Sequence, residues 1–303
     1  MTLRTATPLR PRKRGAKRTH PAADERHKNH DIYFVPGLRR GLLVLETLAT
    51  EGRPLSVADI GKRIGLTRSS MFRLAYTLQH MGFIEEIAES KLLRLGPRVL
   101  NIGYAYLASQ TLIELARPDL EALRDRTGVS SHLAILDRSE ILYLSCIQTR
   151  SGFLSTMNVG TRLPAYATPM GWLLLSDRSA RQLSALYPPA SFVPLTDQTP
   201  RNLSELAQRI ASAVADGHAI SRGAVEPGGS SIAAPVRDRE RRVVAAIDVS
   251  APDSAFDLAL FKTRDVREVM ETAARISARL GYAVPRDAQR AVRSGGRGRR
   301  NRG

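Results

Sequence analysis

The stretch from Gly65 to Arg73 holds the residues of this chain best suited to recognising a partner by hydrogen bonds. It reads Gly-Leu-Thr-Arg-Ser-Ser-Met-Phe-Arg, so guanidinium and hydroxyl groups are concentrated in nine residues. Such groups donate hydrogen bonds to phosphate oxygens and to base edges in the DNA major groove. The stretch therefore predicts a DNA-reading surface. The residues predicted to contact DNA here are Thr67, Arg68, Ser69, Ser70, Phe72 and Arg73.

Two short helices are predicted to hold this surface at a sharp turn. Ser56 can cap the first helix and Thr67 the second, because each side-chain oxygen can accept a hydrogen bond from a backbone N–H of the first turn. Gly65 lies between them, where a tight turn needs a left-handed backbone. An earlier helix is expected from about Gly37 to Thr50. All three have apolar residues at the spacing of one buried face: Leu42, Leu45, Leu48, Val57, Ile60, Ile64, Met71, Leu74, Ala75 and Leu78.

This arrangement is typical of a helix-turn-helix, whose second helix enters the major groove. The alternative is an ordinary helical hairpin with solvated arginines. Residues 83–87 and 91–95 favour the first interpretation, because two β-prone runs directly after the helices predict the hairpin called a wing. Lys91 and Arg94 are predicted to face the phosphate backbone. The intervening Ala-Glu-Ser has neither glycine nor asparagine, so it does not indicate a two-residue hairpin turn.

Positive charge is concentrated at the two ends of the chain. The 303 residues carry a formal charge of +17. Residues 1–35 contain nine Lys and Arg against three acidic residues, and residues 286–303 contain seven against one. Basic ends on a nearly neutral body predict a polyanionic partner such as DNA, which the ends would bind without sequence preference. The alternative is that these ends are only solvated disorder.

Composition and motifs argue against a secreted protein, a membrane protein and an enzyme. Cys146 is the single cysteine, so no disulfide can form within the chain. No apolar run is long enough for a secretory signal or a membrane helix. Common catalytic and phosphate-binding motifs are absent, and the adjacent Ser131 and His132 face opposite sides of a predicted strand. We expect no catalytic residue, no cofactor and no metal site, since the histidines of the N-terminal tail are loosely spaced.

Residues 97–285 alternate between helical and strand-like patterns. Helices are expected at 97–110, 118–128, 168–175, 203–215 and 258–280, and strands at 131–136, 141–148, 154–159, 218–221, 232–236 and 243–249. Pro118 is expected to open the second of these helices. Adjacent strands joined by short turns predict an antiparallel sheet with helices packed on it. The predicted fold therefore has two domains, an α-rich winged helix-turn-helix and an α/β (α+β) domain.

Several motifs, in this order, resemble the IclR family of transcriptional regulators. Residues 65–74 resemble the recognition helix of that family, and residues 94–100 resemble its passage from wing to linker. In the second domain, Gly-Thr-Arg-Leu-Pro-Ala-Tyr-Ala-Thr-Pro-Met-Gly at 160–171 and Ser-Ile-Ala-Ala-Pro-Val-Arg-Asp at 231–238 resemble its two most recognisable stretches. The resemblance covers about 36–284. It is closest to the subgroup that controls protocatechuate, 4-hydroxybenzoate and β-ketoadipate catabolism.

The resemblance implies an order of parts along the chain. These are a basic tail (1–35), a winged helix-turn-helix DNA-binding domain (36–96), a linker helix (97–110), an effector-binding domain related in fold to GAF domains (111–284) and an Arg/Gly-rich tail (285–303). It also implies a homodimer or a dimer of dimers on a palindromic operator of double-stranded DNA. The location expected is the bacterial cytoplasm, on the nucleoid, with no membrane partner.

An effector site is expected in the second domain. Thr168 followed by Pro169 can begin the helix through Leu175, whose first N–H groups would attract a carboxylate. Three serines and an aspartate lie on segments that resemble the pocket wall of the family, although each hydroxyl alone could be an ordinary sheet serine. The residues predicted for the site are Thr168, Pro169, Met170, Ser221, Ser231, Asp248 and Ser250. Trp172 stands where the family usually has Lys or Arg, so the effector can differ from those of the subgroup.

The sequence thus predicts a sequence-specific DNA-binding regulator whose second domain senses a small carboxylate, an aromatic acid or its catabolite. Two alternatives remain open. One is a basic protein that binds DNA without specificity. The other is a small-molecule-binding enzyme with a fused DNA-binding domain.

Overall fold

The computed structural model describes residues 33–149, 157–256 and 260–283. The chain divides into two compact units, Met1–Tyr104 and Ala105–Gly303. The predicted C-terminal tail and all but the last three residues of the predicted N-terminal tail lie outside the described residues.

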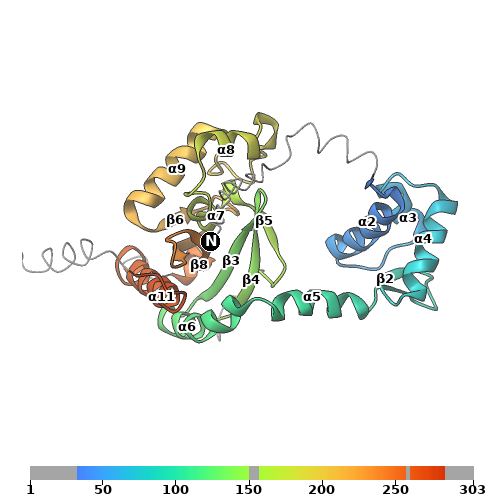
Figure 1. Cartoon of the computed structure of the whole chain (residues 1–303), viewed down its shortest axis with the longest axis horizontal. Helices are drawn as coiled ribbons and strands as arrows, with labels where there is room; N and C mark the ends of the chain where they lie inside the picture. The colour runs from blue at the N-terminus through green and yellow to red at the C-terminus, as the bar shows by residue number, and fades with distance from the viewer. Residues whose placement is uncertain (1–32, 150–156, 257–259, 284–303) are drawn as a thin grey trace, which may run out of the picture. The chain divides into compact units, whose positions relative to one another are not determined.

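The first unit contains the predicted helix-turn-helix. Its helices are α2 (Pro36–Glu51), α3 (Val57–Arg63) and α4 (Arg68–His80) (Figure 1). The two predicted caps are confirmed, because Ser56 Oγ accepts from the Asp59 N–H at 3.1 Å and Thr67 Oγ1 accepts from the Ser70 N–H at 3.3 Å. Gly65 takes the left-handed backbone with a φ of 67°. The apolar faces of the helices meet in one core of Val44, Leu48, Leu55, Ile60, Met71, Ala75, Ile84 and Leu93.

The predicted wing is confirmed as a short antiparallel hairpin. Strands β1 (Ile84–Glu86) and β2 (Leu93–Leu95) pair with Ile84 opposite Leu95. The turn between them is longer than the three residues Ala-Glu-Ser, since the Lys91 N–H closes it by donating to the Ile87 carbonyl at 2.8 Å. Lys91 itself takes the positive φ of 57°. In the absence of a glycine, Lys91 therefore takes the left-handed backbone conformation that the turn needs, and the hairpin still forms.

Helix α5 (Arg98–Ala108) follows, and α6 (Thr111–Thr127) begins the second unit's fold. The expectation that Pro118 opens a helix is wrong, because α6 starts seven residues earlier and contains Pro118 in its interior. Proline has no N–H to donate and usually interrupts a helix. Burial of Ala116, Leu120 and Leu123 on the same helix outweighs that loss.

Six strands form one antiparallel sheet in the order β5-β4-β3-β8-β7-β6. The strands are β3 (Ser130–Asp137), β4 (Glu140–Ile147), β5 (Arg162–Pro164), β6 (Ala219–Arg222), β7 (Gly229–Arg237) and β8 (Val243–Pro252). Strand β5 was not expected from the sequence. Of the strand expected at 154–159, residues 157–159 are not in a strand, and 154–156 lie outside the described residues.

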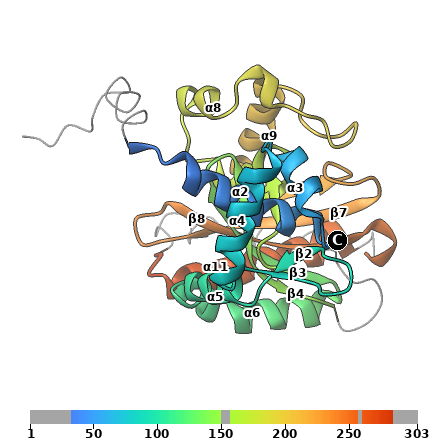
Figure 2. The same cartoon turned by 90° about the vertical axis from the view of Figure 1, so that its right-hand side faces the viewer.

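Helices cover both faces of this sheet. Helix α6 and α11 (Val266–Arg279), which follows a π-helix at Phe261–Asp265, pack on one face. Helices α7 (Pro169–Leu174), α8 (Ala180–Leu186) and α9 (Leu203–Asp216) lie on the other face. Figure 2 shows α8 and α9 above the sheet and α6 and α11 below it. Short 3-10 helices occur at Ala165–Ala167, Pro189–Ser191 and Asp253–Ala255. The predicted fold class, a helix-turn-helix domain followed by an antiparallel sheet with packed helices, is confirmed.

None of the described helices combines the length and the apolar character needed to cross a membrane.

Among the described glycines of the second unit, Gly171 allows the closest approach to neighbouring backbone. A Cβ atom added there would overlap the carbonyl oxygen of Ala165, which belongs to the 3-10 helix preceding α7. We expect Gly171→Ala to destabilise the protein by about 1–3 kcal/mol, because the overlap is with backbone that cannot swing away. Thermal unfolding followed by circular dichroism measures the loss.

Gly103→Ala is the matched control. An added Cβ there meets nothing within 4 Å, and Gly103 lies in the exposed helix α5. We expect it to stabilise the protein by about 0.5–1 kcal/mol, or to leave it unchanged. Equal melting temperatures for the two variants would show that the approach of Gly171 to Ala165 imposes no constraint.

Candidate DNA-reading surface and ligand pocket

Helix α4 buries one face and exposes the predicted DNA contacts. Met71 and Ala75 are buried, whereas Phe72 is 66% exposed. Arg68 and Arg73 are exposed as well, and no ion-pair partner for either guanidinium is found among the described residues. Two unpaired arginines on the outer face of such a helix leave their hydrogen-bond donors available to an anion.

The structure separates the remaining predicted residues of this helix by role. Thr67 and Ser69 are exposed, and Ser70 is half-buried. Thr67 caps the helix through the Ser70 N–H, and its hydroxyl also donates to Ser70 Oγ at 3.1 Å. Ser70 therefore helps to begin the helix, and its hydroxyl is less available to DNA than that of Ser69.

The predicted contacts on the wing are paired with acidic neighbours. Lys91 Nζ lies 3.0 Å from Glu86 Oε1, and Arg94 Nη2 lies 2.9 Å from Glu85 Oε2. Both pairs are exposed, and exposed ion pairs contribute only about 0–1 kcal/mol. A phosphate could therefore replace either carboxylate at small cost.

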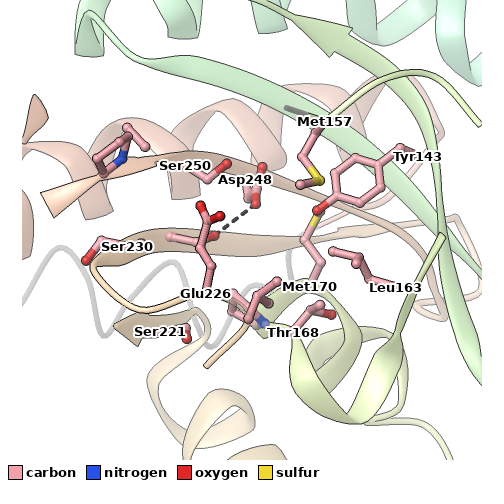
Figure 3. A pocket seen from close by; sticks show the side chains of 16 residues that line it. Tyr143, Met157, Leu163, Thr168, Met170, Ser221, Glu226, Ser230, Asp248 and Ser250 are labelled. Carbon is pink, nitrogen blue, oxygen red and sulfur yellow. Dashed lines mark hydrogen bonds between the residues drawn. The ribbon is translucent and has the colours of Figure 1, made fainter. Parts of the chain in front are cut away.

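A pocket opens on the face of the sheet that carries α7. The pocket is open on one side, and its space together with the adjoining solvent amounts to about 620 Å³. Figure 3 shows its walls, which come from strands β4 to β8, the start of α7 and the segment before β7. All seven residues predicted for the effector site line it. The lining residues are Tyr143, Met157, Leu163, Thr168, Pro169, Met170, Ser221, Val225, Glu226, Gly229, Ser230, Ser231, Asp248, Ser250, Ala251 and Pro252.

A buried hydrogen-bond network forms the floor of the pocket around Asp248, which is 2% exposed. His132 Nδ1 lies 2.8 Å from Asp248 Oδ1, and the Ser231 hydroxyl donates to Asp248 Oδ2 at 2.9 Å (Figure 3). Ser250 Oγ lies 3.4 Å from His132 Nδ1. The sequence does not indicate that His132 belongs to this network, because only the register of β3 with β8 sets it opposite Asp248.

The first turn of α7 offers fewer free N–H groups than expected. Thr168 does cap the helix, but its Oγ1 accepts from the Gly171 N–H at 3.0 Å and its carbonyl from the Trp172 N–H at 3.0 Å. Pro169 has no N–H to donate. The expectation of several unpaired donors is therefore wrong. Met170 keeps the one first-turn N–H for which the described residues provide no acceptor.

Trp172 faces away from the pocket. It is 2% exposed, its Nε1–H donates to the Tyr166 carbonyl at 2.7 Å, and the Arg209 guanidinium lies 5.3 Å from its ring. Residues two apart on a helix point in widely different directions, so Met170 lines the pocket and Trp172 packs against α9.

The charged groups of the pocket are acidic. Of its lining residues, Asp248 and Glu226 are charged, and none is Lys, Arg or His. Figure 3 shows the Glu226 side chain extending into the pocket toward Asp248. Gly229 makes room for it, since an added Cβ would lie 2.8 Å from Glu226 Cγ. Burial, and then the charge of Asp248, raise the pKa of the Tyr143 phenol well above its usual value.

The described residues hold no group of three or more His, Cys, Asp and Glu side chains that could bind a metal ion.

Comparison with known proteins gives matches over most of the chain. The family described as IclR helix-turn-helix domain matches residues 37–87, and the family described as bacterial transcriptional regulator IclR C-terminal matches residues 104–278. The HTH-type transcriptional regulator XynR of Escherichia coli is 30% identical over 82% of this chain and 98% of its own length. The Pca regulon regulatory protein of Pseudomonas putida is 32% identical over 73% of this chain and 75% of its own.

A solved structure shows the same fold. It is an IclR homolog from Microbacterium hydrocarbonoxydans in complex with 4-hydroxybenzoate. The two chains superpose with a TM-score of 0.69 and 25% identity, over 81% of this chain and 99% of the homolog.

Cys146 offers a chemical test of the charge at the pocket floor. Burial first, and the charge of Asp248 second, raise the pKa of this thiol from 9.0 to about 12. At pH 8 the fraction of Cys146 present as thiolate is then about a thousandfold smaller in the folded protein than in the unfolded chain. A more basic thiolate is a stronger nucleophile, which offsets about twentyfold of this decrease in the labelling rate. We expect iodoacetamide to label the folded protein about fiftyfold more slowly than the urea-unfolded chain, as measured by mass spectrometry.

The same labelling reports on Asp248 directly. Asp248→Asn removes the negative charge and should speed the labelling of Cys146, whereas Glu121→Gln, on the helix that covers the opposite face of the sheet, should not. Equal labelling rates for the two variants would mean that Asp248 carries no charge that Cys146 senses.

Proposed function

Because the chain belongs to the IclR family of bacterial transcriptional regulators, we propose that it regulates genes of aromatic-acid catabolism by binding a palindromic operator under control of a small organic acid. The family assignment itself means a DNA-binding regulator with an effector-binding C-terminal domain. Our proposal adds the palindromic operator, the type of effector and the assembly of the chain. We propose no catalytic role, and we expect the protein to act on the nucleoid in the cytoplasm.

The unpaired arginines of α4 carry the DNA part of the proposal. They lie on the exposed side of the second helix of a winged helix-turn-helix, which is the side that enters the major groove in this motif. Arg73 is in the second turn, and Arg68 and Ser69 are in the first. We propose that Arg73 reads a base edge and that Lys91 and Arg94 of the wing contact phosphates after exchanging their carboxylate partners.

Exposed apolar residues on α5 support a dimer. This helix buries none of its residues in the monomer, and Leu100, Ile102 and Tyr104 are 71%, 63% and 67% exposed. A run of large apolar side chains left in water is unusual for a monomer and favours association with another surface. We propose that the partner is a second copy of this chain, as a two-fold symmetric operator requires.

The pocket supports a small organic acid with an aromatic ring. Tyr143, Met157, Leu163 and Met170 give it an apolar wall of the kind that holds rings. The Met170 N–H and the hydroxyl of Ser221 are the donors that we assign to the effector carboxylate. The Ser231 hydroxyl already donates to Asp248 and is not one of them. The regulators named above for the Pca regulon and for the 4-hydroxybenzoate complex make 4-hydroxybenzoate and protocatechuate the first candidates.

Replacement of Arg73 tests operator recognition. We expect Arg73→Ala to weaken specific binding by about 1–3 kcal/mol per half-site, because one bidentate contact to a base is lost. Titration of the operator at fixed salt measures the change. Arg53→Ala is the control, since Arg53 is exposed, pairs with Glu51 and lies outside α4. Unchanged binding by Arg73→Ala would assign recognition to other residues. A footprint spread over random DNA would indicate a nonspecific binding protein instead.

Thermal unfolding with a panel of acids tests the effector. We expect 4-hydroxybenzoate or protocatechuate to raise the melting temperature of the wild type by mass action. Ser221→Ala should weaken the ligand by about 1.5–3 kcal/mol, because a hydrogen bond to a charged group is lost. Ser204→Ala, on the exposed side of α9, should not change it. If no acid stabilises the protein at millimolar concentration, the proposed effector class is wrong. Chemical turnover of an acid would favour the enzyme alternative.

A further inference from the structure

The geometry points to a hydrogen-bond-donating group, best a protonated amine, at the end of the effector that lies over Asp248. We propose this as the feature that distinguishes the ligands of this chain. The inference rests on the proposed function, because it concerns the same pocket. It adds that a carboxylate alone does not satisfy the site.

Asp248 has acceptor capacity that the protein does not use. A carboxylate offers about four lone-pair positions. His132 and Ser231 occupy one on each oxygen, at 2.8 and 2.9 Å. Asp248 nevertheless lines the pocket, so its remaining lone pairs can be reached from the side where a ligand enters. A buried acceptor that faces a cavity is best satisfied by a donor on the occupant.

The charge of Asp248 is not balanced within its network. His132 is fully buried, and its Nε2 has no hydrogen-bond partner among the described residues. An imidazolium would bury an N–H there without an acceptor, which costs more than an unused lone pair. The geometry therefore favours a neutral imidazole that donates from Nδ1 to Asp248. Ser231 is also a neutral donor, so with a neutral imidazole the network places no cation against the carboxylate.

Glu226 adds a second negative charge at the mouth of the pocket. It is exposed, and no cation pairs with it in the described part of the chain. The neighbouring Arg222 is engaged elsewhere, with its Nη2 3.3 Å from Asp253 Oδ2. A ligand that enters the pocket therefore passes the Glu226 carboxylate and then reaches the Asp248 carboxylate. An acid without a donor would bring a third negative charge into this space.

A protonated amine answers all of these constraints. It cancels the charge of Asp248 and donates up to three hydrogen bonds. A hydroxyl donates one and cancels no charge, so it fits less well. An alkyl group excludes water from the Asp248 carboxylate and offers it no hydrogen bond in return. The effector carboxylate would then lie at the Met170 N–H, at the other end of the molecule.

Three acids of nearly equal shape test the assignment. They are 4-(aminomethyl)benzoate, 4-(hydroxymethyl)benzoate and 4-ethylbenzoate, which share the ring and the carboxylate and differ in the terminal group. Isothermal titration of the full chain should rank them in that order. The amine should bind about tenfold to a hundredfold more tightly than the ethyl compound, as for a hydrogen bond to a buried charge.

Two variants connect this ranking to the named carboxylates. Asp248→Asn keeps the shape of the side chain and an acceptor for His132, so the fold should survive, and the preference for the amine should nearly vanish. Glu226→Gln should reduce the preference by a smaller factor, because Glu226 is exposed and its charge is screened. Glu121→Gln, on the opposite face of the sheet, should leave it unchanged.

Benzylamine separates failure of this inference from failure of the proposed function. If 4-ethylbenzoate binds as tightly as the amine, or if Asp248→Asn keeps the preference, the assignment to Asp248 is overturned and the organic-acid proposal stands. If benzylamine binds in an Asp248-dependent manner while no acid does, the assignment stands and the proposed effector class is wrong. If neither benzylamine nor any acid binds, both are wrong.

Discussion

Strands β3 and β8 pair at the centre of the sheet of the second unit, with His132 directly opposite Asp248. Side chains alternate between the two faces of a strand, so this register sends His132 and Asp248 to the pocket side. It sends Ser131 to the other side, where its hydroxyl donates to the Leu120 carbonyl of α6 at 2.8 Å. A slip by one residue would exchange the two sets and bury a carboxylate under α6. Both the pocket floor and the packing of α6 thus depend on one register.

Features set by a few neighbouring residues were predictable from the sequence. The caps at Ser56 and Thr67 and the left-handed turn at Gly65 are of this kind, and each is found where it was expected. The wing was predictable as a hairpin, but its closure through Lys91 was not, because a lysine with positive φ has no signal in the sequence. The helix start predicted at Pro118 was wrong because a local sequence signal was overridden by burial of apolar residues along α6, which begins at Thr111.

The pocket was predictable as a set of residues but not as a chemical environment. Family resemblance placed Ser231 and Asp248 together, and both line the pocket. His132 could not be added, because its contact with Asp248 joins residues 116 positions apart and depends on the register. Thr168 was expected to leave free N–H groups and instead consumes one as the cap, so a correct cap led to a wrong electrostatic expectation. The negative charge of the pocket was not predictable, because it depends on Glu226 and Asp248 facing the same space in the folded chain (Figure 3).

The edges of the sheet are its shortest strands, and this limits how the domain can associate. β5 has three residues and ends in Pro164, and β6 has four and ends in Arg222. A short edge that carries proline or charge is a poor template for an added strand, since it offers few free backbone groups in line. Copies of this domain are therefore protected against joining edge to edge into continuous sheets, the route by which antiparallel proteins aggregate. Copies of the domain are therefore expected to associate through side-chain contacts rather than through backbone hydrogen bonds at the sheet edges.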